Sequence, residues 1–218
     1  MDLSKRPPLF ITFEGIDGCG KTTQARLFAE RLTDRNVPFI QTREPGGSPF
    51  AETLRDILLG PDGAKIPPLS QALLMTAARQ DHVHNTIKPA LARGEWVLCD
   101  RFIDSTTAYQ GYGLGLSLPL IQMLHQEIGF LPDLTFIFSL APEIAAQRRN
   151  KRQSTETSNH LDTQEADFYT RAHHGFQKIA AENTNRCHLI PAEDALDDIT
   201  GRTWRALEGF IQKNATSA

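Results

Sequence analysis

The sequence predicts an α/β fold: a doubly wound, five-stranded parallel sheet with helices on both faces, forming a single domain over residues 1–218. Short runs of β-branched and aromatic residues alternate with longer helical patterns, as they do in βαβ units. The run at 133–140 is apolar almost throughout, which is typical of a central strand. A chain of this length buries about 70% of its unfolded surface, and no Gly/Ser linker divides it.

The expected elements follow in order along the chain. The first strand is a β-branched and aromatic run that stops at Gly15, and a helical pattern begins shortly afterwards. Strands are expected at 9–14, 37–42, 95–100, 133–140 and 186–190. Helices are expected near 21–35, 49–59, 69–93, 117–129, 142–149, 164–184 and 195–212.

Residues 15–22, between the first strand and the first helix, match the pattern G-x-x-x-x-G-K-[ST]. In this context the glycines let backbone N–H groups wrap a phosphate. Lys21 would add charge over the β- and γ-phosphates of ATP, and the Thr22 hydroxyl would ligate Mg²⁺. A dinucleotide fingerprint starting at Gly18 is disfavoured, because Thr23 occupies its third glycine position. The predicted ATP-phosphate ligands are Gly15, Ile16, Asp17, Gly18, Cys19, Gly20, Lys21, Thr22 and Thr23.

Composition argues against several classes of function. The net charge is −3 and no long basic run occurs, so we expect no nucleic-acid partner. No apolar stretch approaches the ~20 residues of a membrane helix, and the opening residues lack a signal-peptide core, so we expect no membrane association. Three cysteines at unrelated spacings indicate a reduced, cytoplasmic chain. The histidines show no metal-site spacing.

A polar segment at 147–160 contains no large apolar residue. It carries four cations, Arg148, Arg149, Lys151 and Arg152, against one carboxylate. Two interpretations are open: a solvated loop, or a lid over about 147–163 that carries arginines onto phosphates and excludes water. Its place after a helix start, in a chain with a phosphate loop, favours the lid.

Charged residues also follow two other strands. At the end of the third strand, Asp100 would reach Mg²⁺, directly or through water, and Arg101 would lie where two phosphate chains meet. A strand-end salt bridge is the alternative. Arg43, before a Glu-Pro-Gly-Gly turn, is either a turn residue or a phosphate clamp. Arg79 belongs to an apolar helix, so its charge lies either at the helix edge or in a pocket.

Four segments together resemble the thymidylate kinase family: EGIDGCGKTT at 14–23, TREPGG at 42–47, DRF at 100–102 and STTAYQG at 105–111. In this order and spacing they are much more specific than the phosphate loop alone. The similarity runs over about residues 9–215. It implies transfer of the ATP γ-phosphoryl group to dTMP, with Mg²⁺, by a homodimeric enzyme.

The resemblance also implies roles for individual residues. Asp17 would bind the sugar 3′-hydroxyl, and Tyr109 would pack under the sugar where a ribose 2′-hydroxyl would clash. Arg79 would reach the thymine carbonyl. The implied dTMP ligands are Asp17, Arg43, Met75, Arg79, Arg101, Thr106, Tyr109 and Gln110, with Arg43 and Arg101 on the phosphate. The implied catalytic residues are Lys21, Arg101, Arg148 and Arg152, since Gly18 stands where one branch of the family has a catalytic arginine.

Three departures from the family pattern bear on base preference and lid chemistry. Met75 replaces the usual phenylalanine that stacks on thymine. The lid reads Asn-His-Leu-Asp at 159–162, where Asp-Arg-Ile/Leu-Glu is usual. Gly-Leu-Gly at 113–115 replaces Gly-Arg-Gly.

Two other functions remain open: a kinase for another pyrimidine monophosphate (dUMP, UMP or CMP), and a nucleotide-binding homologue with weakened catalysis. A switch GTPase is disfavoured, because Asn-Lys-Arg-Gln at 150–153 lacks the Asp of a guanine motif. A phosphate acceptor is already a nucleophile near neutral pH, so the reaction needs no general base.

Overall fold

The computed structural model describes residues 3–153 and 166–215. One sheet of five parallel strands forms its centre, as predicted, and its strands lie in the order β2-β3-β1-β4-β5. β1 and β3 are neighbours, but the chain runs from β1 to β2 in one direction across the sheet and from β3 to β4 in the other. In parallel sheets, such a reversal opens a crevice above the carboxyl ends of the two strands. The strands are β1 (Phe10–Glu14), β2 (Phe39–Arg43), β3 (Trp96–Asp100), β4 (Leu134–Ser139) and β5 (Cys187–Pro191).

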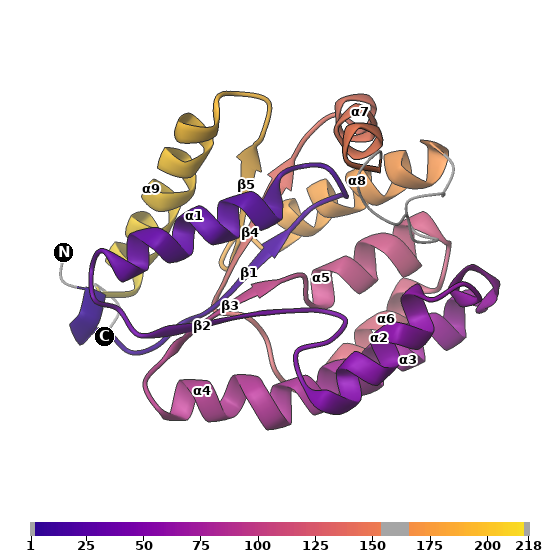
Figure 1. The fold of residues 1–218 in the computed structure, drawn as a ribbon, viewed down its shortest axis with the longest axis horizontal. Helices are drawn as coiled ribbons and strands as arrows, with labels where there is room; N and C mark the ends of the chain where they lie inside the picture. Colours follow the sequence, from indigo (N-terminus) through magenta and orange to yellow (C-terminus); the bar gives the residue numbers. More distant parts are fainter. Residues whose placement is uncertain (1–2, 154–165, 216–218) are drawn as a thin grey trace.

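Helices cover both faces of the sheet. Figure 1 shows α1 and α9 together on one side, and α4 on the other. The long helices are α1 (Lys21–Thr33), α2 (Pro49–Leu59), α3 (Pro68–His82), α6 (Leu118–Ile128), α7 (Pro142–Gln153), α8 (Ala166–Glu182) and α9 (Leu196–Ala215). Two shorter ones are α4 (Lys88–Ala92) and α5 (Ile103–Thr106). Single 3₁₀ turns lie at Leu3–Lys5 and Gly63–Lys65.

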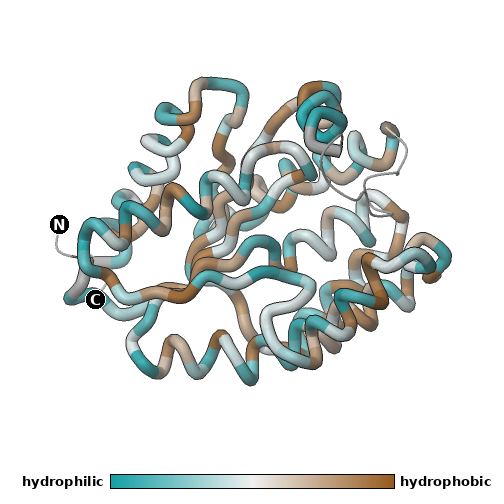
Figure 2. Tube along the Cα trace, in the orientation of Figure 1, coloured by the Kyte–Doolittle hydropathy of each residue, from teal (hydrophilic) through white to brown (hydrophobic). Residues whose placement is uncertain are grey.

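An aromatic cluster fixes α1 against the sheet. The Phe13 ring centre lies 5.5 Å from that of Phe28 on α1 and 5.6 Å from that of Phe136 on β4. β4 is buried along its whole length except at Ser139, which confirms the prediction for the apolar run at 133–140. Hydrophobic residues concentrate along the central strands (Figure 2). The loop between β1 and α1 therefore starts from a rigid base.

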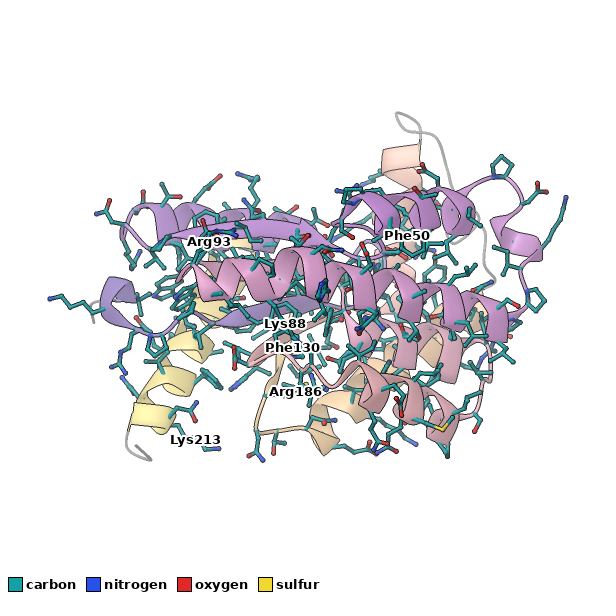
Figure 3. All side chains as sticks on the ribbon, turned by 90° about the horizontal axis from the view of Figure 1, so that it is seen from below. Phe50, Lys88, Arg93, Phe130, Arg186 and Lys213 are labelled. Carbon is teal, nitrogen blue, oxygen red and sulfur yellow. The ribbon has the colours of Figure 1, made fainter. Side chains whose placement is uncertain are left out.

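A second cluster, below the sheet, anchors the chain after β3. The Phe10 ring contacts Phe102 edge-on at 4.9 Å and stacks on Phe130 at 5.6 Å. Lys88 Nζ lies 5.4 Å from the Phe130 ring centre, and the two side chains are neighbours in Figure 3. Because Phe102 is completely buried, the backbone at Arg101 is held at the edge of the crevice.

The helix predicted at 69–93 is present but not uniform. It consists of α3, a π-helical turn at Val83–Ile87, and α4. Pro89 lies in the first turn of α4 and has no N–H to give to the preceding turn. The wider π turn accommodates this missing donor without breaking the helix.

Residues 103–113 form a helical segment that the sequence analysis did not predict. It comprises α5 and a π-helical turn at Thr107–Gly113. The segment lacks an amphipathic pattern, because polar side chains such as Asp104, Ser105 and Gln110 are buried in it. Hydrogen bonds to residues distant in the sequence stabilise this segment, and a local sequence pattern does not predict such bonds.

The first part of the predicted lid, residues 147–153, continues helix α7 rather than forming a loop. Residues 154–163 of that segment lie outside the described residues. No helix among the residues described is long and apolar enough to span a membrane. The assignment of residues 1–218 to one domain stays a prediction.

Candidate active site

The loop between β1 and α1 has the shape of a phosphate cradle. Gly15 and Gly18 both have positive φ angles, of 132° and 89°. A Cβ at Gly15 would lie 2.5 Å from the Phe138 carbonyl oxygen, and one at Gly18 would lie 2.3 Å from that of Ala145. Only glycine therefore allows the loop to pack this closely under β4 and α7. The loop leads directly into α1, whose first-turn N–H groups have no acceptor within the helix.

Asp17 is the anionic centre of this loop. Its carboxylate contacts the Arg101 guanidinium, lies 3.4 Å from Lys21 Nζ, and accepts a hydrogen bond of 3.1 Å from the Tyr109 hydroxyl. Burial by itself would raise the pKa of Asp17, but the charges of Arg101 and Lys21 hold that pKa well below its usual range. Asp17 is therefore ionised and joins three predicted site residues.

Thr22 and Asp100 meet as the sequence predicted. The Thr22 hydroxyl donates to Asp100 Oδ2 at 2.6 Å. The second carboxylate oxygen, Asp100 Oδ1, is buried and has no hydrogen-bond partner among the described residues. A hydroxyl and an unsatisfied carboxylate oxygen beside a phosphate loop are ligands of the hard, oxygen-donor type that suits Mg²⁺.

Arg101 lies between the loop and the segment after β3. It adopts a positive φ of 71°, which is unusual for a residue with a side chain. Its guanidinium donates to the Gly15 carbonyl at 3.3 Å and to the Ser105 hydroxyl at 3.1 Å. Burial tends to lower the pKa of Arg101, but the adjacent Asp17 raises that pKa well above its usual value. The strained backbone is thus held by charge pairing at the centre of the site.

Glu14 explains how that strain is held, and the sequence analysis missed it. It is fully buried, and its Oε1 accepts hydrogen bonds from the Phe102 and Ser105 N–H groups at 2.7 and 3.3 Å. Its Oε2 accepts from the Ser105 hydroxyl at 2.6 Å. Burial, and then the nearby Asp104, raise the pKa of Glu14 to about 8. In the sequence, the one feature that could have singled out Glu14 was its position as a carboxylate at the end of an apolar strand.

Glu14 gives the fold a defined pH dependence. Folded Glu14 binds its proton more tightly than the unfolded chain does, so its contribution to the free energy of unfolding is complete below pH 4.5 and is lost as pH rises to about 8. In Glu14→Gln nothing titrates at this position. We expect the stability of Glu14→Gln relative to the unmodified protein to increase across this range, because only the unmodified protein loses stability as Glu14 ionises.

Urea unfolding of both proteins near pH 5 and near pH 9 measures this difference. Other groups titrate in both proteins and cancel in the comparison. Parallel dependence of the free energy of unfolding on pH in the two proteins would contradict the expectation.

A pocket opens beside the loop and collects most of the predicted dTMP ligands. Asp17, Met75, Arg79, Arg101, Thr106, Tyr109 and Gln110 all line it, together with Glu44, Pro45, Arg55, Leu59, Phe102 and Ser105. Arg43 is not one of its lining residues. The Arg43 side chain is 53% exposed and pairs with Glu52 at 3.0 Å, and Glu52 also accepts from the Gly47 N–H at 2.8 Å.

Arg79 is buried and points into the pocket, which decides between the two placements left open by the sequence. Its Nε donates to Glu44 at 2.7 Å, and its Nη2 donates to the Phe102 carbonyl and the Thr106 hydroxyl. Its Nη1 is buried without a partner among the described residues. Glu44 also accepts from buried His82 at 3.0 Å. The pairing compensates the buried charge and leaves one donor for a ligand.

Arg55, on α2, lines the pocket together with Arg79 and Arg101, and it was not predicted from the sequence. Its Nη1 donates to the Pro45 carbonyl at 2.7 Å. Half-burial lowers the pKa of Arg55, and the neighbouring charge of Arg43 lowers it further. On an amphipathic helix an arginine usually marks the solvent face, so no sequence signal distinguished this residue.

The arginine segment reaches the loop through Arg149 on α7. Its Nη1 donates to the Asp17 carbonyl at 3.3 Å, and its guanidinium stacks over the Tyr169 ring at 3.9 Å. Arg148, selected from the sequence, is the half-buried neighbour on the same helix. The side chain of Arg152 lies outside the described part of the chain.

Comparison with known proteins gives one consistent result. The family model for thymidylate kinase matches residues 13–202. A thymidylate kinase of Rhodopseudomonas palustris (strain TIE-1) is 47% identical over 201 residues, which are 91% of this chain and 87% of that protein. A thymidylate kinase of Bacillus pumilus is 36% identical over 94% of this chain and 98% of its own.

The solved structures agree. The crystal structure of a thymidylate kinase from Ehrlichia chaffeensis superimposes with a TM-score of 0.74 and 37% identity, covering 93% of this chain and 99% of that one. The match extends across the loop, the pocket and the sheet that holds them. This chain belongs to the thymidylate kinase family.

Proposed function

We propose that the protein performs the reaction of its family, transfer of the γ-phosphoryl group of ATP to dTMP to give dTDP and ADP, with ATP on the glycine loop and dTMP in the adjacent pocket. One observation carries the choice of acceptor. Two buried polar atoms of the pocket residues, Arg79 Nη1 and Gln110 Oε1, have no partner among the described residues. The first is a donor and the second an acceptor, and thymine presents a carbonyl oxygen beside an imide N–H.

The sugar and phosphate of dTMP would lie toward the loop. Asp17 is the proposed partner of the 3′-hydroxyl, and the buried Tyr109 ring supports the face of the sugar. Arg101 and Arg55 are the proposed ligands of the acceptor phosphate, because both guanidinium groups line the pocket. For Arg43 we propose a supporting role through Glu52, in addition to the phosphate contact expected from the sequence.

On the donor side, Lys21 is the proposed partner of the β- and γ-phosphates. Thr22 and Asp100 would hold Mg²⁺, and the unpartnered Asp100 Oδ1 fits such a ligand. When bound, Mg²⁺ neutralises charge on the phosphate oxygens. Arg148 and Arg152 stay proposed as catalytic arginines, and the neighbouring Arg149 binds the loop backbone at the Asp17 carbonyl.

The catalytic problem is repulsion between two anions. The acceptor phosphate carries about −2 charge near neutral pH and needs no base. Each pair of unit charges at 4 Å costs ~1 kcal/mol in water and ~4 kcal/mol at an effective dielectric constant of 20. Arg101 and Arg55 line the pocket, and Lys21 Nζ lies 3.4 Å from the carboxylate of Asp17, another lining residue. They therefore lower this repulsion and align the reacting groups.

A coupled ADP-release assay with dTMP, dUMP, UMP and dCMP as acceptors tests the proposal. We expect turnover with dTMP and weaker turnover with dUMP. UMP should be poor because of Tyr109, and dCMP because its base edge mismatches Arg79 and Gln110. Met75 at the thymine-stacking position favours the alternative of a less strict pyrimidine kinase, which equal rates for dTMP and dUMP would support. ADP release independent of any acceptor would contradict the kinase assignment.

We also propose that the enzyme is a homodimer of the cytoplasm. α2, α3 and α6 pack side by side, and large apolar side chains are exposed on them, including Phe50 at 52%, which Figure 3 labels. The exposed apolar residues of these helices are Phe50, Ile57, Leu69, Leu73, Leu118 and Met123. Burial of such a face would stabilise an isologous pair. Light scattering of the assay preparation tests the dimer.

The proposed cytoplasmic location is supported by the free cysteines Cys19, Cys99 and Cys187, which agree with a reducing compartment.

A further inference from the structure

A buried glutamine, Gln71, lies next to the pocket. It belongs to none of the sequence motifs and is not one of the residues that line the pocket. It belongs to the first turn of α3 and is 5% exposed. Its Nε2 donates to the Ile66 carbonyl at 2.9 Å. Its Oε1 accepts from Gln110 Nε2 at 3.2 Å. Gln71 does not line the pocket itself and is hydrogen-bonded to one lining residue, Gln110, which is 1% exposed.

This pair of bonds fixes which end of the Gln110 amide faces the ligand. The oxygen and the nitrogen of an amide have nearly the same shape, so packing alone does not orient the group. A backbone carbonyl only accepts, so Ile66 requires the amino group of Gln71. The Gln71 oxygen is then turned to Gln110 and requires its amino group. The remaining atom, Gln110 Oε1, is buried and has no hydrogen-bond partner in the part of the chain that the structure describes.

An acceptor in this position discriminates between pyrimidines. The imide N3–H of thymine or uracil donates to Gln110 Oε1. Cytosine carries a lone pair at N3, so two acceptors would face each other in a buried site. We propose that Gln71 is a specificity-determining positioning residue: by fixing the orientation of the Gln110 amide, it makes the pocket select an imide base edge over a cytosine edge. This inference rests on the proposed function of the pocket.

The sharpest probe is 5-methyl-dCMP, because it carries the thymine methyl group and differs from dTMP only at the N3/C4 edge. The measured quantity is the ratio of kcat/KM for dTMP to kcat/KM for 5-methyl-dCMP. In Gln71→Met the Gln110 amide loses its partner and turns freely, so we expect this ratio to fall about tenfold or more. Activity toward 5-methyl-dCMP should rise in absolute terms, and general structural damage does not produce such a gain.

Two further variants separate orientation from stability. In Gln71→Glu a carboxylate oxygen still accepts from Gln110, so the ratio should stay within about threefold of the original. The carboxylate has no N–H for the Ile66 carbonyl, so that bond is lost and thermal stability should fall. In Gln71→Lys the ammonium group donates to both Ile66 and Gln110. This reverses the Gln110 amide, so 5-methyl-dCMP activity should rise even if Gln71→Met does not fold.

Gln80→Met, at an exposed position of the same helix, is the matched control and should leave the ratio unchanged. An unchanged ratio in Gln71→Met or Gln71→Lys, with the KM for ATP also unchanged, would overturn the role of Gln71. Failure of the unmodified protein to phosphorylate dTMP would instead overturn the proposed function. The two failures are therefore distinguishable.

Discussion

Replacement of Arg101 by alanine is expected to lower kcat for phosphoryl transfer by about 10³-fold or more, the scale of arginines that stabilise transferring phosphoryl groups. Arg101 joins the loop, through the Gly15 carbonyl and Asp17, to the segment after β3, through the Ser105 hydroxyl. Its removal takes away a phosphate ligand and also leaves Asp17 with less compensating charge. Steady-state kcat and KM for dTMP, measured on protein shown to be folded by circular dichroism, give the result.

Two controls define the reason for that loss. Arg101→Lys keeps the charge but not the planar, bidentate fork, so it should recover only part of kcat. Arg93→Ala removes an arginine that is 58% exposed, paired with Glu95 and remote from the pocket, and should leave kcat unchanged. A kcat for Arg101→Ala within a few-fold of the original would mean that Arg101 organises the fold and not the reaction.

Lys21→Ala is expected to have an effect of similar size, about 10³-fold on kcat. Lys21 is buried at the start of α1, where its ammonium group lies 3.4 Å from Asp17. Its loss removes the point charge over the donor phosphates, and that charge is needed most in the transition state, so kcat should fall more than the affinity for ATP.

Arg26→Ala is a matched control for Lys21, because Arg26 is an exposed cation on the same helix, paired with Glu30. It should leave kcat unchanged. The measurements are kcat from the coupled assay and ATP affinity from titration calorimetry. A Lys21→Ala variant that lost ATP binding but kept kcat at saturating ATP would contradict the role assigned to Lys21.

The five strands and the phosphate loop are predictable from the sequence because their signals are local. The alternation of apolar strands with helical patterns predicted the five-stranded sheet, which the structure confirmed. The glycines of the loop predicted a backbone that side chains do not obstruct, and in the structure Gly15, Gly18 and Gly20 have positive φ angles. Thr22 and Asp100 are 78 positions apart, yet they meet because each follows a neighbouring parallel strand. Strand-end position was therefore enough to bring them together.

The residues that position the site through buried hydrogen bonds could not be predicted from the sequence in the same way. Glu14 and Ser105 are 91 positions apart, and Gln71 and Gln110 are 39 apart. Neither pair shares a strand end or a motif that predicts the contact. The helical segment at 103–113 was missed for the same reason, since its polar residues form their bonds with distant elements.

The sequence by itself determined the fold class and the phosphate loop, because these depend on local apolar periodicity and on the spacing of glycines along the chain. It also indicated the family, through the resemblance of four segments in their order and spacing. Tertiary structure alone decided that Arg79 is buried, with one donor unpartnered within residues 3–153 and 166–215, and that Arg55 rather than Arg43 lines the pocket. It also decided which end of the Gln110 amide faces a ligand. The physical reason is that the direction of a hydrogen bond and the cost of burying a charge are properties of partners brought together by folding, and those partners are not neighbours along the chain.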